Sequence, residues 1–455
     1  MRLLQLLLLA CSSSGVAKLD ESGDSLAPET DSGAPIDSLS TSDSDDSGES
    51  VEEDPPDPPC ALDDSGGLAL AVEGDFVGQG GAVTASRDRC EAALHATAGA
   101  ATSTLTITLD AWDGEGEALV TVVDLLGAPL AGPVAVVAGG GFNVGLVRSG
   151  EVLVRIEPAD PDAGPTTHTL SVACAAGCEL SFTRHPLVLM HGMGGTDSFL
   201  GLFDYFIDVK EALEAEGYEV HTPAVDAFMP TETRAAQWAA AIDTLMVEGK
   251  GRRFNLIAHS QGGIDARYLV SALGYSDRVV SVTTLATPHH GTSVADAAMG
   301  VLDVSAVAEW IIDAAMAGLA ALIGLGESAD FSAQLAGLTH DEMAAFNAVV
   351  TDVDGVWYRS WSGRTCGALD FTCQGETDGE IVDAHFAATY TLVQLLDGEN
   401  DGLVPVDSAI WGEHLGTMPA DHLNQLGFFN NAFTSPFDHL TFFSVEVATL
   451  RDAGL

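Results

Sequence analysis

The stretch Phe254-Asn-Leu-Ile-Ala-His-Ser-Gln-Gly-Gly263 decides the fold. It begins with an apolar, strand-like run and leads into a helical pattern over residues 262–273. Between the two lies a turn of the form small-x-Ser-x-Gly, centred on Ser260. A serine in so sharp a turn needs small residues two positions before and after it, because larger side chains would clash, and Ala258 and Gly262 meet that need. The stretch therefore predicts a strained turn that presents Ser260 as a nucleophile.

The chain around this turn alternates between two kinds of pattern from Arg184 onward. Apolar strand-like runs and amphipathic helical patterns follow one another, which is typical of a mostly parallel sheet covered by helices. A serine turn inside such a region indicates an α/β-hydrolase fold, and we expect the catalytic domain to span residues 183–455. The predicted strands are 186–190, 218–222, 254–257 and 279–285, and the predicted helices are 203–217, 233–248 and 262–273.

A glycine-rich loop, His191-Gly-Met-Gly-Gly195, follows the first of these strands. Glycines there let backbone N–H groups turn toward the oxygen of a bound substrate. The expected oxyanion donors are the backbone amides of Met193 and of Gln261, the residue after the nucleophile. The loop does not resemble a phosphate-binding loop, because it lacks the lysine and the spacing of that motif.

A serine nucleophile also needs a base and an acid, which follow it in the order acid, then histidine, in this fold. Asp401 lies in the turn Asn400-Asp-Gly-Leu-Val-Pro405 and His422 in Ala420-Asp-His-Leu423. His422 is expected to accept the Ser260 proton, and Asp401 to orient the imidazole. Spacing alone leaves rivals open: His439 repeats the Asp-His-Leu pattern, and Asp383 or Asp407 could replace Asp401.

The N-terminal residues read as an export signal. Residues 3–10 form a short apolar run after Arg2, and Leu8-Leu9-Ala10-Cys11 matches a bacterial lipoprotein box. The sequence thus predicts a signal over residues 1–11, a lipidated Cys11 that anchors the chain to a membrane, and outer-membrane sorting, since Ser12 follows. The alternative is an ordinary leader behind a misassigned start codon, and either reading predicts export.

Two further regions precede the catalytic domain. Residues 12–59 are rich in Ser, Asp, Glu, Gly and Pro, and they cannot bury enough apolar surface to order themselves, so we expect a disordered acidic tether. Residues 60–182 contain short strand-like runs between Gly and Asp clusters, which predicts a β-sandwich-like domain. The expected strands there are 104–109, 118–125, 134–137, 152–156 and 169–173.

The cysteines fit an oxidising compartment. Apart from Cys11 there are six, an even number suited to disulfides, and no spacing resembles a zinc site. Cys366 and Cys373 are close enough to close one loop. The other four are expected to pair among themselves: Cys60, Cys90, Cys174 and Cys178.

The charge of the chain excludes some partners. It carries 17 Lys+Arg against 67 Asp+Glu, a formal net charge of −50. No nucleic acid partner is expected, because few cations could neutralise phosphates. Attraction to an anionic membrane surface is disfavoured for the same reason. The acidic excess is typical of a solubilising surface.

Beyond single motifs, the part from Arg184 to the C-terminus resembles the bacterial true lipases of the Pseudomonas and Burkholderia type. The matching segments are His185–Asp197, Asn255–Gly263, Val282–Gly291, Tyr358–Gly363, Asn400–Val404 and His422–Gln425. The resemblance implies Ser260, Asp401 and His422 as triad and Met193 and Gln261 as oxyanion donors, and it leaves His439 a structural residue. By position, the apolar segment 301–325 resembles the lid of these lipases, with the lid region expected around 296–330. Its alternative is a buried helix pair, and its acidic residues argue against a transmembrane span.

Two positions depart from that family. The family has a calcium-ligating aspartate two residues after the triad histidine, where this chain has Asn424. A neutral amide oxygen can ligate calcium, but with less charge, so the sequence leaves a structural calcium open without supporting it. Asp407 stands where the family has a disulfide cysteine. Ala258 is shared with the Bacillus lipases.

Together these features predict an extracytoplasmic serine lipase that forms an acyl-enzyme and favours triacylglycerols. No cofactor is required by that chemistry. The alternatives are a short-chain carboxylesterase and a non-catalytic surface-binding lipoprotein. A lipid or ester is the expected substrate, and a chaperone-like foldase is a candidate partner.

Overall fold

The computed structural model describes the greater part of the chain beyond residue 81. The predicted signal with Cys11, the tether and three of the paired cysteines (Cys60, Cys90 and Cys178) lie outside the described residues. The described residues are 82–88, 92–97, 103–146, 150–160, 167–176, 182–195, 198–199, 203–302, 311–317, 329–368, 373, 380–430 and 435–455.

The first eight strands form two antiparallel four-stranded sheets, with strand orders β1-β8-β3-β6 and β2-β7-β4-β5. Inward-facing residues alternate along β3, as Leu105, Ile107 and Leu109 show, and both sheets contribute to one apolar core. The sandwich predicted for this region is therefore confirmed, whereas the domain boundaries stay predictions. The strands are β1 (Ala82–Asp88), β2 (Ala92–Thr97), β3 (Ser103–Trp112), β4 (Ala118–Val123), β5 (Pro129–Val136), β6 (Gly141–Leu146), β7 (Gly150–Pro158) and β8 (Thr167–Ala176).

A six-stranded parallel sheet follows, in the order β12-β9-β13-β14-β15-β16. Every residue of β9, β13 and β14 is buried, because helices cover both faces of the sheet. That burial is why most residues of these strands are apolar or β-branched. The strands are β9 (Leu187–Met190), β12 (Val220–His221), β13 (Phe254–His259), β14 (Val279–Leu285), β15 (Trp357–Arg364) and β16 (Glu413–Pro419).

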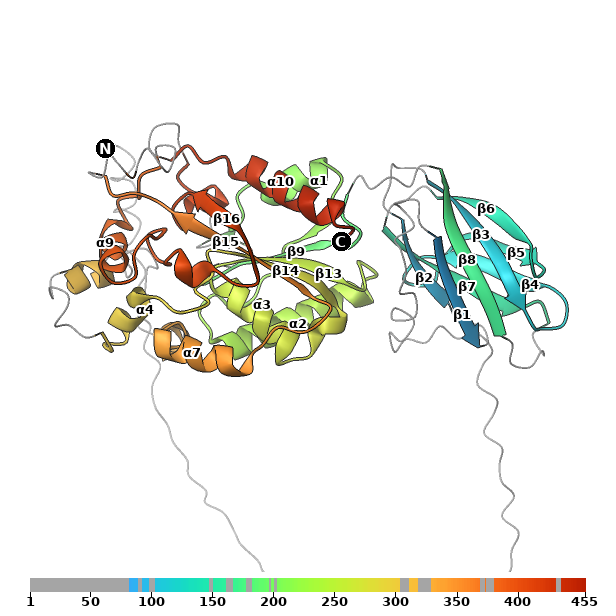
Figure 1. Ribbon diagram of the computed structural model, residues 1–455, viewed down its shortest axis with the longest axis horizontal. Coiled ribbons are helices and arrows are strands. Elements are labelled where there is room, and N and C mark those ends of the chain that lie inside the picture. Colours follow the sequence, from blue (N-terminus) through green and yellow to red (C-terminus); the bar gives the residue numbers. More distant parts are fainter. Residues whose placement is uncertain are drawn as a thin grey trace, which may run out of the picture. The chain divides into compact units, whose positions relative to one another are not determined.

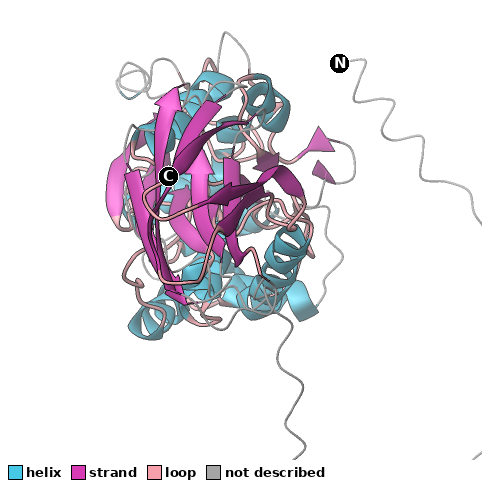
Figure 2. Cartoon of the chain, turned by 90° about the vertical axis from the view of Figure 1, so that its right-hand side faces the viewer, coloured by secondary structure: helices cyan, strands magenta, loops and turns pink. Residues whose placement is uncertain are grey.

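Helices pack on both faces of this sheet, which confirms the α/β-hydrolase class. α1 (Val209–Ala215) and α10 (His439–Asp452) cover one face, and α2 (Thr231–Val247) and α3 (Gln261–Ser271) cover the other (Figure 1). The described residues from 82 to 176 contain strands and no helix, whereas helices and strands alternate after residue 204. Figure 2 distinguishes the helices (cyan) from the strands (magenta). The remaining helices are α4 (Ser293–Ala298), α6 (Ala329–Ala336), α7 (His340–Val349) and α9 (Ala387–Leu396).

The helix predicted over 203–217 is wrong in its first part. The short strand β11 (Phe203–Asp204) pairs there with β10 (Ser198–Phe199), and α1 begins only at Val209. Asp208, just before the helix, has a φ of 55°, which interrupts a right-handed helix. Tyr205 and Phe206 are in the core instead, and the next residue bonds through its backbone to Leu426 O.

Only part of the predicted lid lies among the described residues. Residues 311–317 are helical, and Ala315 packs with Ala297 of α4 and Leu392 of α9. The stretches 303–310 and 318–328 lie outside the described residues. None of the helices in the described ranges is long and apolar enough to cross a membrane.

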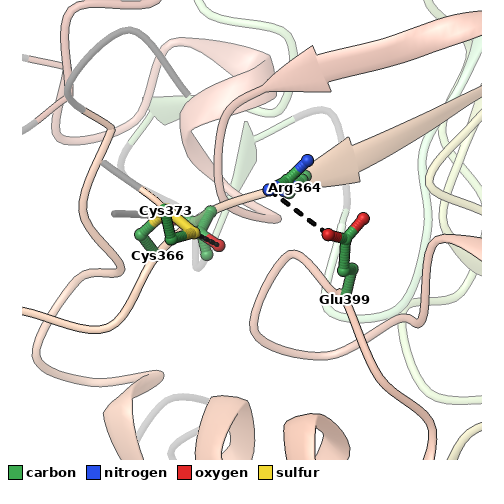
Figure 3. Close-up of a disulfide and its surroundings, with 5 residues drawn as sticks. Arg364, Cys366, Cys373 and Glu399 are labelled. Atoms are coloured by element: carbon green, nitrogen blue, oxygen red, sulfur yellow. Dashed lines mark hydrogen bonds and ion pairs between the residues drawn. A yellow bond between two sulfur atoms is a disulfide. The ribbon is translucent and has the colours of Figure 1, made fainter. Parts of the chain in front are cut away.

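The predicted loop disulfide between Cys366 and Cys373 is present (Figure 3). It follows β15, whose last residue, Arg364, forms an ion pair with Glu399 (3.2 Å). The next residue, Thr365, donates its backbone N–H to Asn400 O (3.0 Å). The disulfide loop therefore lies next to the turn that carries Asp401.

Candidate active site

Ser260 lies in the tight turn between β13 and α3. Its backbone has φ 56° and ψ −131°, a strained conformation for a residue with a side chain. Gly262 is required here, because a Cβ atom at this position would lie 2.6 Å from Met190 O and 2.9 Å from His191 O. Ala258 is completely buried. The small residues on both sides thus allow the strand, the turn and the helix to pack closely.

Two distant loops bring a histidine and a carboxylate to this serine. His422 Nε2 lies 3.0 Å from Ser260 Oγ, and His422 Nδ1 lies 2.7 Å from Asp401 Oδ2. Asp401 is fully buried and His422 is 5% exposed, so water barely competes for these contacts. Serine, imidazole and carboxylate therefore form one continuous hydrogen-bonded chain.

The Asp401 carboxylate is held by further hydrogen bonds. Its Oδ1 accepts the backbone N–H groups of Leu403 (3.0 Å) and Val404 (2.8 Å), and its Oδ2 accepts Gln425 Nε2 (3.1 Å). These donors fix the orientation of the carboxylate, and Asp401 in turn fixes the imidazole. Gln425 is a member of the site that sequence reasoning did not single out, although it lies within the matched His422–Gln425 segment.

The structure does not bring the rival residues to Ser260. His439 begins α10, and its Nε2 contacts Ile207 O (2.9 Å). Asp383 accepts a hydrogen bond from Asn424 Nδ2 (3.4 Å), and Asp407 begins the short helix η4 (Asp407–Ala409).

The glycine-rich loop packs directly against the serine turn. A Cβ atom on Gly192 would lie 2.8 Å from Ser260 Cβ and 2.9 Å from His259 O, so only glycine fits this approach. Gly194 has a φ of 76° and donates its N–H to Ala227 O (3.1 Å). The backbone of Met193 therefore lies between two constrained glycines beside the serine. Gln261 adjoins Ser260 as the first residue of α3, where helix amides favour negative charge.

The sequence of this chain is similar to those of known proteins. A family model described as palmitoyl protein thioesterase matches residues 186–321. A triacylglycerol lipase of Vibrio cholerae is 31% identical over 317 residues, which cover 64% of this chain and 94% of that protein. The chain belongs to the bacterial triacylglycerol lipase family. A second member of this lipase family, from Burkholderia plantarii, is 28% identical over 309 residues, covering 58% of this chain and 86% of its own.

The family resemblance drawn from the motifs is thereby confirmed, and the chain is an ester hydrolase. Among solved structures, the mature Bacillus licheniformis lipase BlEst2 is 21% identical, with a TM-score of 0.42 and coverage of 59% of this chain and 92% of that one.

A buried arginine supports the loop that carries Met193. Arg234, on α2, donates from Nη2 to His191 O (2.6 Å) and from Nε to Asp265 Oδ2 (2.7 Å). Its Nη1 reaches Asp226 O (2.6 Å), and the side chain is fully buried. Burial raises the pKa of Asp265 to about 6, and the Arg234 guanidinium opposes that rise. The sequence offered one signal for this pair. Each residue is a charged side chain that lies among apolar residues of a predicted helix.

Helix α6 packs beside the serine turn and the glycine-rich loop. The buried Gln334 amide donates to Gln261 Oε1 and to Ala227 O (3.2 Å), the carbonyl that also receives the Gly194 N–H. Gln334 thus links α6 to both parts of the expected oxyanion hole. Around Met193 an apolar cluster gathers from several helices: Phe228, Val294, Phe331, Leu335 and Val393.

The calcium position of the lipase family is filled differently here. Asn424 is fully buried, and its Nδ2 donates to Phe428 O (2.8 Å) and to Asp383 Oδ2 (3.4 Å). An N–H donor therefore faces the oxygens that a cation would attract, so these residues do not fit calcium. No group of three or more His, Cys, Asp or Glu in the described part of the chain is arranged to hold a metal ion.

Carboxyl groups nevertheless gather close to this asparagine. Burial and the nearby Asp421 charge raise the pKa of Glu380 to about 8. Burial, and after it the charge of Asp383, raises the pKa of Asp421 to about 7, although backbone hydrogen bonds oppose the rise. Both shifts are upward, so each group holds its proton to a higher pH than an ordinary carboxyl group does.

Proposed function

We propose that the protein hydrolyses acyl esters through a covalent acyl-enzyme on Ser260. The observation that carries the proposal is the hydrogen-bonded chain from Ser260 Oγ to His422 (3.0 Å) and Asp401 (2.7 Å), beside the glycine-rich loop. As Oγ bonds to the ester carbonyl carbon, His422 Nε2 takes its proton, and Asp401 stabilises the imidazolium that forms. The carbonyl oxygen becomes an oxyanion, which the backbone N–H groups of Met193 and Gln261 stabilise.

In the remaining steps His422 gives up the proton that it took from Ser260, and it later accepts one from water. His422 donates its proton to the alkoxy oxygen, the C–O bond breaks, and the alcohol leaves the acyl group on Ser260. Water then gives a proton to His422 and attacks the acyl carbon. The Ser260 ester breaks as His422 returns that proton to Oγ, which releases the carboxylic acid and restores the enzyme.

Triacylglycerols are the substrates that we favour. Support comes from the relatives, which bear the name triacylglycerol lipase, and from the apolar cluster around Met193, which suits acyl chains. A short-chain carboxylesterase is the second candidate.

A substrate series separates the two candidates. Initial rates on triacylglycerols of increasing chain length, below and above their solubility, are expected to rise once an emulsion forms and to remain high for long chains. An apolar cleft that binds long acyl chains gives this result, because each added buried methylene contributes about 0.8 kcal/mol. Turnover of soluble butyrate esters with none on any emulsion would establish the esterase instead. A wild-type protein without activity on either substrate would contradict ester hydrolysis altogether.

We also propose that the enzyme needs no calcium, because the Asn424 amide takes the place of the cation. A chelator should therefore leave its melting temperature and activity unchanged. Asn424→Asp replaces the donor by a carboxylate among Asp383, Asp421 and Glu380, so its melting temperature should fall by several degrees and recover when calcium is added. Asn347→Asp, at an asparagine bonded to His289 O, is the matched control and should show no recovery with calcium. Loss of wild-type stability on chelation would refute the idea.

For location, we propose that the chain is exported and held at the bacterial outer membrane through a lipidated Cys11. The lipoprotein box and Ser12 support the anchor, and the acidic composition of residues 12–59 supports a flexible tether.

A further inference from the structure

The ring of His259 lies against the proposed catalytic base, yet the triad does not use it. His259 is the last residue of β13, directly before Ser260, and is fully buried. Its ring centroid lies 4.6 Å from that of His422. A second histidine this close to a base could disturb it, because a charge on His259 would repel the imidazolium that forms on His422.

One tyrosine hydroxyl contacts the ring of His259. Tyr205 Oη lies 2.9 Å from His259 Nδ1, and the same hydroxyl accepts a backbone hydrogen bond from Gly192. The Gly192 amide can only donate, which leaves the hydrogen of the hydroxyl free to point at His259 Nδ1. We infer that it does so, in which case Nδ1 carries no proton and His259 is neutral with its proton on Nε2.

The surroundings favour this neutral state. Burial lowers the pKa of His259 well below its ordinary value, and the neighbouring His422 lowers it further. On its other side Tyr205 faces the ring of His191, at 5.6 Å between centroids, and the positive charge of Arg234. Another charged group nearby is the carboxylate of Asp401, which is hydrogen-bonded to His422 Nδ1.

We propose that Tyr205 and His259 are positioning residues for the hydrolytic reaction. The Tyr205 hydroxyl ties the glycine-rich loop, through Gly192, to a neutral ring that lies against His422. The position of the glycine-rich loop relative to His422 is thereby fixed. Because His259 is uncharged, it does not repel the imidazolium that forms on His422 in the transition state. This proposal rests on the proposed function of Ser260 and His422.

Tyr205→Phe tests the proposal, because it keeps the aromatic ring and removes only the hydroxyl. On a soluble butyrate ester, kcat should fall by about 10- to 100-fold with KM changed less than about two-fold, as expected when only transition-state stabilisation is lost. Without the donor at Nδ1, His259 can take up a proton. The acid limb of the plot of kcat/KM against pH should therefore move to higher pH and steepen toward a slope of two.

A double variant assigns that change to the ring. In Tyr205→Phe/His259→Gln the residue at 259 no longer titrates, so the slope should return to one. Tyr218→Phe is the matched control. This tyrosine is also buried, and its hydroxyl accepts a hydrogen bond from Arg451 Nη1 (3.5 Å), so the variant should have the kcat and pH profile of the wild type. Thermal unfolding of each variant shows whether it is folded. If Tyr205→Phe does not fold, His259→Gln carries the test alone, and it should lower kcat with a slope of one.

Three results would overturn the proposal. They are a folded Tyr205→Phe with wild-type kcat, a lowered kcat with an unchanged pH profile, and a double variant that keeps the steep limb. The proposed function is tested separately, because its failure appears as an inactive wild type. An active wild type whose Tyr205→Phe variant matches it would contradict the positioning role alone.

Discussion

Replacing Ser260 by alanine is expected to lower kcat for ester hydrolysis by about a million-fold, the loss typical of removing a serine nucleophile that acts together with its base. The methyl group of alanine can occupy the same strained turn, at φ 56°, without a new clash. The fold and the melting temperature should therefore stay close to wild type. Steady-state rates on a soluble ester and thermal unfolding measure the two quantities.

A labelling experiment completes this test. A fluorophosphonate probe should modify the wild type and leave Ser260→Ala unlabelled. Ser444→Ala is the matched control, because this partly exposed α10 serine donates to Glu216 (2.8 Å), and the variant should keep full rate and full label. Undiminished labelling of Ser260→Ala, or no labelling of an active wild type, would contradict the acyl-enzyme mechanism.

Replacing His422 by alanine should reduce kcat as strongly, by about a million-fold, because Ser260 then lacks the group that takes its proton. His422 is the only histidine in the described part of the chain whose ring lies within hydrogen-bonding distance of Ser260 Oγ. The same rate measurement applies, with thermal unfolding to show that the variant is folded.

His439→Ala is the natural control for this variant. Its ring contacts Ile207 O at the start of α10, so the change should lower stability by about 1 kcal/mol, as for the loss of one hydrogen bond, and leave kcat near wild type. The reverse pattern, with His439 essential and His422 dispensable, would refute the proposed triad.

Much of the fold was predictable because its signals are local. β14 spans the residues predicted for it, since a strand buried on both faces is rich in apolar and β-branched residues. The turn at Ser260 was equally readable, because its steric demand falls on residues two positions away. The start of α1 could not be predicted from the sequence. Asp208 adopts a left-handed conformation where the chain packs against residues near Leu426, which are far away in sequence.

Supporting residues of the site escaped the sequence for a related reason. Arg234 and Asp265 look like ordinary helix charges until α2 and α3 bury them against each other behind His191. Tyr205 was assigned to a helix, and only its contact with His259 gives it a role. The meaning of Asn424 also depends on where its amide points, toward Asp383 and Phe428 O.

The sequence by itself determined the strand–turn–helix around Ser260, the alternation that builds a parallel sheet, and the family of the chain. These depend on residue size and apolar periodicity, which are written in consecutive positions. Only the tertiary structure decided which histidine contacts the serine and which carboxylate contacts that histidine. Proton transfer requires contact at about 3 Å, and separation along the chain does not report distance in space, since His422 lies 162 positions from Ser260. The packing of the loops around the sheet brings them together.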